Sequence, residues 1–160
     1  MERIDRILGN EKYRDYLRRN QQEEQERIFC RHDMAHFLDV ARIGWILVLE
    51  ENLPIEKEIV YAAALLHDIG RYLQYREGQP HEKASAKLAP EILKECGFDE
   101  NETDIIIEAI EKHRDKNVQG EENLNGILYR ADKAGRPCFA CDAEKLCDWK
   151  QEKKNKKIRY

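Results

Sequence analysis

The stretch that decides the fold of this chain is Tyr61-Ala62-Ala63-Ala64-Leu65-Leu66-His67-Asp68. A run of alanine and leucine, which favour helices, leads directly into an imidazole and a carboxylate. Gly70 follows two residues later, where helices commonly end. Burying His67 and Asp68 at the end of such a helix is costly unless they are paired or hold a metal ion. The stretch therefore predicts a helical core with a metal site inside it.

Apolar residues recur at helical spacing along the rest of the chain as well. We expect an amphipathic helical segment before the polar residues 20–26, then helices over about 33–52, 55–69, 81–96, 105–113 and 124–134. Pro90 should kink or divide the helix over 81–96, because proline removes a backbone donor. A loop is expected over about 72–80. With no alternating strand pattern, the prediction is an all-α helical bundle that forms a single domain over residues 1–160.

Composition narrows the range of functions. The chain has 160 residues, 38% of them charged, and a net charge of −4, which argues against a nucleic-acid-binding domain because such domains need a basic face. The basic residues 150–160 leave contact with nucleic acid or acidic lipid as an alternative to a solvated chain end. No apolar stretch approaches the roughly 20 residues of a membrane helix. The first residues do not resemble a signal peptide, so we expect a cytoplasmic protein.

Three segments together resemble the HD-domain superfamily of metal-dependent phosphohydrolases: RHDMAHFLDVAR (residues 31–42), ALLHDIGR (64–71) and ADK (131–133). The resemblance covers about residues 30–136 and leaves a cysteine-containing segment at 137–160. It implies an all-helical core in which a metal-activated water cleaves a phosphoester or phosphoanhydride. The metal ligands that it implies are His36, His67, Asp68 and Asp132.

His81 and His113 decide how many ions are expected. Their order after the doublet resembles that of the histidines that hold the second ion in two-metal members of the superfamily. The alternative is that both are ordinary surface or helix-end histidines. A second doublet, His32-Asp33, lacks the apolar run before it. Because His32 and His36 are four residues apart, they can share a helical face, and we expect His32 to support the site or begin the helix rather than bind metal.

The same pattern suggests catalytic roles for three charged residues. Asp68 could orient the attacking water or accept its proton. Arg71 and Lys133 are expected to contact phosphate oxygens, as could Arg136, although each could also be an ion-paired surface cation. Histidine and carboxylate ligands suit several divalent ions, of which iron or manganese is favoured here, with zinc, nickel, cobalt and magnesium as alternatives.

The five cysteines are an odd number, which fits a reducing compartment better than a disulfide scaffold. Cys138, Cys141 and Cys147 have the spacing C-x2-C-x5-C and could hold a separate structural zinc ion or an iron–sulfur cluster, with Cys30 as a fourth ligand. Alternatively, these thiols pack as small apolar groups.

The expected function is metal-dependent hydrolysis of a small phosphorylated molecule, most simply a nucleotide. The rival hypothesis is a non-catalytic sensor or interaction module that binds a metal and a phosphorylated ligand on the same scaffold. The segments around residues 72–80 and 116–123 carry no recognisable substrate-binding motif. The motif of cyclic dinucleotide phosphodiesterases is absent.

Overall fold

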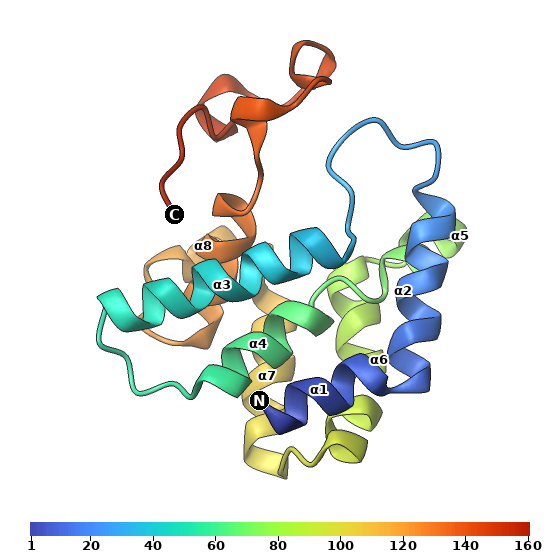
Figure 1. Ribbon diagram of the computed structural model, residues 1–160, viewed down its shortest axis with the longest axis vertical. Coiled ribbons are helices and arrows are strands. Elements are labelled where there is room, and N and C mark those ends of the chain that lie inside the picture. Colours follow the sequence, from blue (N-terminus) through green and yellow to red (C-terminus); the bar gives the residue numbers. More distant parts are fainter.

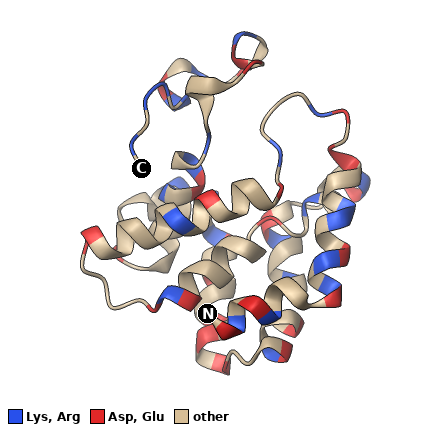
Figure 2. Cartoon of the chain, in the orientation of Figure 1, with Lys and Arg blue, Asp and Glu red and all other residues tan.

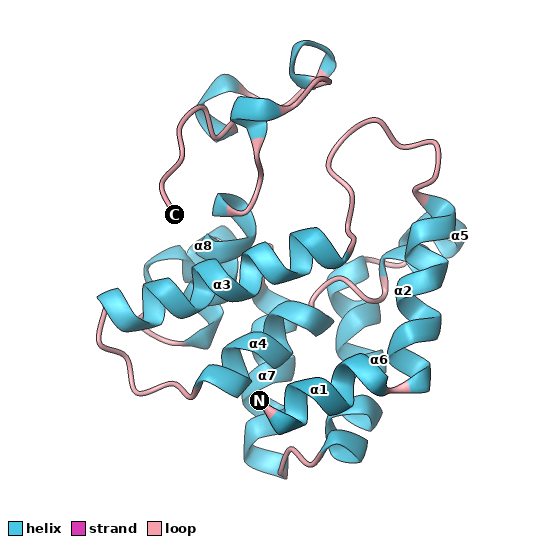
Figure 3. Cartoon of the chain, in the orientation of Figure 1, coloured by secondary structure: helices cyan, strands magenta, loops and turns pink.

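A computed structural model describes all residues, 1–160, and confirms an all-α fold without strands (Figures 1 and 3). The α-helices are α1 (Glu2–Gly9), α2 (Glu11–Glu23), α3 (Met34–Glu50), α4 (Lys57–Leu66), α5 (Arg71–Glu77), α6 (His81–Cys96), α7 (Glu100–Lys112) and α8 (Leu124–Ala134). Short 3-10 turns are η1 (Lys116–Gly120), η2 (Cys138–Ala140), η3 (Glu144–Leu146) and η4 (Gln151–Lys153). None of the helices is both long and apolar enough to span a membrane.

Helix α4 lies at the centre of the bundle. It contacts α1, α3, α7 and α8, and its residues from Ala62 to Leu66 are almost completely buried. Small side chains allow this close packing: a Cβ atom added at Gly44 of α3 would lie 2.9 Å from Val60 Cγ1. The apolar run that predicted a buried helix therefore carries His67 and Asp68 into the middle of a core of 30 residues.

The N-terminal segment forms two helices rather than one. The backbone leaves the helical conformation at Asn10, whose side chain accepts a hydrogen bond from the Tyr13 N–H at 3.1 Å and so caps α2. Helix α1 packs against α4 and α6, and α2 packs against α5 (Figure 1). These two helices therefore cover the side of the core where the chain passes from α4 into α5.

One local expectation was wrong, and of the two effects expected of Pro90, division of the helix does not occur. Residues 71–77 form helix α5 instead of a loop, because Tyr72 is buried against α2, where its ring stacks on Tyr16 at a centroid distance of 6.0 Å. Helix α6 runs through Pro90 without division. The neighbouring Ala89 and Ile92 are fully buried in the core, and this packing compensates for the missing backbone hydrogen bond.

The last residues leave the bundle after α8 and arch over α3 and α8 (Figure 1). We call residues 137–160 the C-terminal segment. It is fastened by Asn155, whose Nδ2 donates to the carbonyl oxygens of Lys133 at 2.8 Å and Arg136 at 3.0 Å. The buried Lys154 ammonium group donates to the carbonyl oxygens of Glu144 and Cys147. That the whole chain is one domain stays a prediction.

Candidate metal centre

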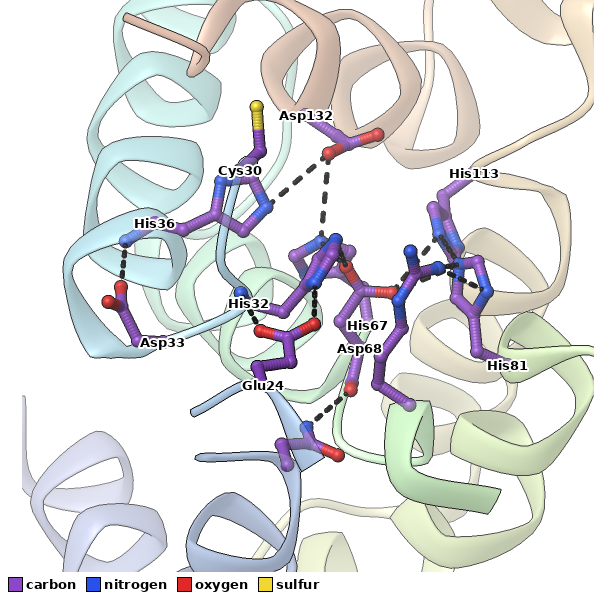
Figure 4. A network of polar contacts seen from close by, with 12 residues as sticks. Glu24, Cys30, His32, Asp33, His36, His67, Asp68, His81, His113 and Asp132 are labelled. Carbon is purple, nitrogen blue, oxygen red and sulfur yellow. Dashed lines mark hydrogen bonds and ion pairs between the residues drawn. The ribbon is translucent and has the colours of Figure 1, made fainter. Parts of the chain in front are cut away.

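The residues predicted to bind metal meet in the interior at the ends of several helices (Figure 4). His36 lies in the first turn of α3, His67 and Asp68 follow α4, His81 begins α6, His113 follows α7, and Asp132 lies in the last turn of α8. They form two groups of three, in each of which one donor atom per residue lies within 4.8 Å of the others.

The first triad consists of His36, His67 and Asp132. His36 Nε2 lies 3.4 Å and His67 Nε2 lies 3.9 Å from the same oxygen, Asp132 Oδ1. His67 is completely buried, and the other two are largely covered. Three helix ends therefore direct two imidazole nitrogens and one carboxylate oxygen at a common point.

The second triad consists of Asp68, His81 and His113. Asp68 Oδ1 lies 3.1 Å from His81 Nε2 and 3.7 Å from His113 Nε2, and these two nitrogens are 3.2 Å apart. His81 and His113 are therefore not surface histidines: they are 3% and 1% exposed. The structure brings both of them to the site, as the two-metal hypothesis requires.

Asp68 connects the two triads. Its Oδ1 atom faces the second triad, while its Oδ2 atom lies 3.3 Å from His67 Nε2 in the first. A carboxylate can bridge two metal ions because each oxygen offers separate lone pairs. This position explains why the doublet needs both of its residues: His67 belongs to one triad, and Asp68 reaches both.

Backbone contacts set the orientation of two of the histidine rings. His67 Nδ1 lies 2.7 Å from the Ala64 carbonyl oxygen, and His113 Nδ1 lies 2.6 Å from the Ile110 carbonyl oxygen. Since a carbonyl oxygen only accepts, Nδ1 carries the proton in each ring, and Nε2 presents its lone pair to the site. Such a contact commonly orients a metal-binding histidine.

Several buried nitrogen and oxygen atoms that could bind a metal ion have no hydrogen-bond partner in the protein. They include His36 Nε2, His67 Nε2 and Asp68 Oδ1. Leaving a buried polar atom unsatisfied costs about 1–3 kcal/mol. Nitrogen and carboxylate donors of this kind suit divalent ions of the first transition row. The residues present therefore fit a metal centre.

In the second triad, electrostatics favour the protonation states that bind metal, whereas in the first the charges of Asp68 and Asp132 outweigh burial and raise the pKa of His67. Burial, assisted by the positive charge of Arg71, outweighs the Asp68 carboxylate and lowers the pKa of His81 to about 2, and burial lowers the pKa of His113 to about 4. Burial alone would raise the pKa of Asp68 and of Asp132, but neighbouring histidines and cations hold the pKa of both carboxyl groups well below the usual range. At neutral pH the second triad thus presents neutral imidazoles and an ionised carboxylate.

The predicted phosphate-binding residues surround this centre. Lys133 Nζ lies 2.5 Å from Asp132 Oδ2 and 3.3 Å from the His113 carbonyl oxygen. Arg71 Nη1 lies 2.7 Å from His81 Nδ1. Both side chains line the cleft that opens above the triads. The structure places them beside the metal centre, and their contact with phosphate stays a prediction.

His32 lies next to the site but in neither triad. Its Nδ1 atom is 2.5 Å from Glu24 Oε1, and its Nε2 atom is 3.7 Å from Asp68 Oδ2. His32 does not begin the helix, because α3 starts at Met34 and is capped by Asp33. Glu24 is buried, and its Oε1 also accepts a hydrogen bond from the Tyr75 hydroxyl at 2.6 Å. The sequence did not mark Glu24 as part of the site, because the polar stretch around it is typical of the exposed end of a helix.

The predicted cysteine site is not formed. No cysteine belongs to any group of three or more potential metal ligands, and all five thiols are free. Cys138 begins the turn η2 and Cys141 follows it, Cys147 follows the separate turn η3, and Cys30 belongs to the loop after α2. The short sequence spacing does not bring three sulfur atoms within 4.8 Å of one another.

Comparison with known proteins is consistent with this geometry. The HD domain matches residues 34–136, and the chain therefore belongs to the HD-domain family. An uncharacterized protein of Clostridium beijerinckii is 47% identical over 160 residues, the whole of both chains.

Two more distant relatives match only part of the chain. Ribonuclease Y of Mycoplasma mycoides subsp. mycoides is 32% identical over 106 residues, which are 65% of this chain but only 19% of that enzyme. The CRISPR system single-strand-specific deoxyribonuclease Cas10/Csm1 of Methanocaldococcus jannaschii is 37% identical over 76 residues, 43% of this chain and 9% of that protein. No solved structure matches significantly.

Proposed function

We propose that this chain is a two-metal phosphohydrolase that cleaves a phosphoester or phosphoanhydride bond in a small phosphorylated molecule, most simply a nucleotide. One observation carries the proposal: the two oxygens of Asp68 face two separate triads of metal-binding side chains. Membership of the HD-domain family supports hydrolysis of phosphorylated substrates.

Each triad would hold one divalent ion. His36, His67 and Asp132 would hold the first, and Asp68, His81 and His113 the second. Ions bound here would lower the pKa of a water molecule toward neutrality and polarise the phosphoryl oxygens. We favour iron or manganese as the resident ions because the donors are imidazoles and carboxylates without a thiolate.

The protein side chains would position the reactants. Asp68, ionised at neutral pH, would accept a hydrogen bond from the attacking water and so orient it toward phosphorus. Arg71, beside His81, and Lys133, beside Asp132, would contact the phosphoryl oxygens and offset their negative charge. The products are the phosphate and the alcohol or shorter phosphate from which it was cleaved, with one water consumed.

The names of two relatives support a nucleotide as the substrate. One is called a ribonuclease and the other a deoxyribonuclease, and such enzymes cleave phosphodiester bonds between nucleotides. The matches cover only 19% and 9% of those two proteins, so what we transfer is the type of bond.

The experiment that tests the proposal is a phosphate-release assay of the full chain with nucleotides and generic phosphate esters, with and without added manganese or iron. We expect metal-dependent turnover that His67→Ala abolishes, while Lys87→Ala on the exposed face of α6 leaves it unchanged. Metal binding without release of phosphate from any substrate would instead support the sensor hypothesis and reject the enzyme.

A further inference from the structure

The last turn of α8 carries a carboxylate at a point where a helix disfavours negative charge. Asp132 lies in this turn, near the negative end of the helix dipole. Its Oδ2 atom pairs with Lys133 Nζ at 2.5 Å and with Arg136 Nη2 at 3.7 Å. Its Oδ1 atom faces His36 and His67 of the first triad. Two cations therefore occupy one oxygen of the carboxylate and leave the other to a metal ion.

The C-terminal segment restricts the side chain of Arg136. The guanidinium carbon lies 3.8 Å from the centroid of the Trp149 ring, so this group contacts both the ring and the Asp132 carboxylate. Tryptophan attracts a cation more strongly than other aromatic side chains do. The Arg136 side chain is only 13% exposed. Trp149 therefore positions a cation that in turn contacts a metal-binding carboxylate.

Asn155 fixes the backbone of the same turn. The last carbonyl groups of an α-helix have no hydrogen-bond partner within the helix. Asn155 Nδ2 donates to the carbonyl oxygens of Lys133 at 2.8 Å, Ala134 at 3.2 Å and Arg136 at 3.0 Å. These contacts span between 19 and 22 positions of the sequence. One side chain of the C-terminal segment therefore satisfies the end of α8 and restricts the turn that carries Asp132.

The part of the chain that supplies Trp149 and Asn155 is itself fastened. Figure 2 shows Lys and Arg residues along the C-terminal segment, and of these Lys154 is buried. Its Nζ atom donates to the carbonyl oxygens of Glu144 at 3.0 Å and Cys147 at 3.1 Å, and to the Glu144 carboxylate at 3.2 Å. An ammonium group has three donors, so all of them are used. Lys154 thus closes residues 144–154 into a loop that holds Trp149.

From these contacts we propose that the C-terminal segment is a working part of the metal centre. Trp149, through Arg136, and Asn155, through the backbone of α8, hold Asp132 so that its Oδ1 atom faces the first triad. Both are positioning residues, and both lie outside the residues 34–136 that match the HD domain. The inference rests on the proposed function, because it requires that the first triad hold an ion.

The effect should be confined to one of the two triads. Trp149 and Asn155 contact the end of α8, which supplies Asp132 to the first triad and no donor to the second. Groups that orient a metal-binding side chain commonly contribute 10–100-fold to metal affinity. Loss of either contact should therefore weaken binding of the first ion and leave binding of the second unchanged.

The test measures the dissociation constant of Mn²⁺ by isothermal titration calorimetry on full chains in which one triad at a time is disabled. The His113→Ala background retains all three donors of the first triad, and the His36→Ala background retains all three donors of the second. Trp149→Ala, Trp149→Phe and Asn155→Ala are introduced separately into each background. Far-UV circular dichroism checks that each variant keeps its helical content.

Trp45→Ala is the matched control for the loss of a tryptophan that contacts a cation. The Nζ atom of Lys57 lies 5.8 Å from the centroid of the Trp45 ring. Trp45 belongs to α3 and does not line the cleft above the triads. Its replacement should change the affinity for Mn²⁺ by less than about twofold in either background.

In the His113→Ala background, we expect Trp149→Ala and Asn155→Ala each to weaken Mn²⁺ binding at least about tenfold. Trp149→Phe retains a ring for Arg136, so its affinity should stay within about threefold of that background. In the His36→Ala background, all three substitutions should change the affinity by less than about twofold. Recovery with phenylalanine would show that the ring itself positions the cation.

Unchanged affinity of Trp149→Ala in the His113→Ala background would overturn the inference while the two-metal proposal stands. Equal losses in both backgrounds would overturn it as well, because they would indicate a general loss of structure. If Trp149→Ala does not fold, Asn155→Ala decides by the same two criteria. If the His113→Ala background itself binds no Mn²⁺, the first triad is not a metal site, and the inference and the two-metal proposal fail together.

Discussion

The side chain of Asn20 holds the backbone of Asp68 in place. Asn20 Nδ2 donates to the Asp68 carbonyl oxygen at 2.8 Å, and Asn20 Oδ1 accepts from the Tyr72 N–H, also at 2.8 Å. Asn20 is completely buried and belongs to α2, outside the residues that match the HD domain. An N-terminal helix therefore satisfies the backbone groups of the turn that presents the doublet.

Replacement of Asn20 should lower stability and disturb the centre together. Asn20→Ala leaves two buried backbone groups unsatisfied, and we expect a loss of about 2–4 kcal/mol in the free energy of unfolding. Urea denaturation measures it. Asn101→Ala, at an exposed position of α7, is the control and should change stability by less than about 0.5 kcal/mol. Equal stability of the two variants would show that water replaces the Asn20 amide.

Removal of one ligand from the second triad should leave one ion per chain. His113→Ala deletes a donor of that triad but none of the donors of the first. We expect metal content, measured by mass spectrometry on purified protein, to fall from near two ions toward one. One ion per chain in wild type that His113→Ala does not alter would instead reduce His81 and His113 to bystanders and leave a single-metal site.

The buried Glu24 should make stability depend on pH in the acid range. Burial acts to raise its pKa, but hydrogen bonds from His32 and Tyr75 and the charge of His32 outweigh burial and lower the pKa from 4.5 to about 2. A depressed carboxyl pKa contributes stability that is fully present above pH 4.5 and is lost as the pH falls toward 2. The contribution is about 3 kcal/mol by linkage.

Glu24→Gln should therefore be less stable than wild type at pH 6, and the difference should shrink as the pH approaches 2. Unfolding free energies measured in urea between pH 2.5 and pH 6 provide the comparison. The control is Glu26→Gln, at an exposed residue of the following loop that forms no ion pair or side-chain hydrogen bond with the rest of the chain. Parallel curves for wild type and Glu24→Gln would contradict the assignment.

Gly70 occupies a position that excludes a side chain. A Cβ atom there would lie 2.5 Å from the backbone nitrogen of Ser85, and the Gly70 N–H donates to Ser85 Oγ at 3.0 Å. Gly70→Ala should therefore cost about 1–3 kcal/mol by forcing α6 away from the turn that carries the doublet. Differential scanning calorimetry should show a lower Tm than for Gly120→Ala, where no atom lies within 4 Å of the added methyl group.

The sequence predicted the elements that depend on local pattern. The alanine- and leucine-rich run predicted α4, and the ordered histidines and aspartates predicted the residues that the structure gathers into triads. What it could not predict depends on contacts between distant residues. Asn20 and Glu24 approach Asp68 and Tyr75 across 48 and 51 positions, and neither pair has a motif that marks it.

The cysteines illustrate the opposite error. The spacing of Cys138, Cys141 and Cys147 is regular enough to suggest a metal site, but regular spacing brings donors together only when the backbone between them has a suitable shape. Here 3-10 turns separate the thiols. The histidines do come together, because helix ends fixed by a buried core direct them into the two triads.

The division of the donors between two triads has an evolutionary consequence. Helices α6 and α7 supply His81 and His113, and no other donor of either triad comes from them. A descendant could lose both histidines by two substitutions and still possess the three donors of the first triad. Asp68 offers no such route, because its two oxygens serve both groups. If a descendant changed from two ions to one, the ligands from α6 and α7 would be lost while His67 and Asp68 would be kept.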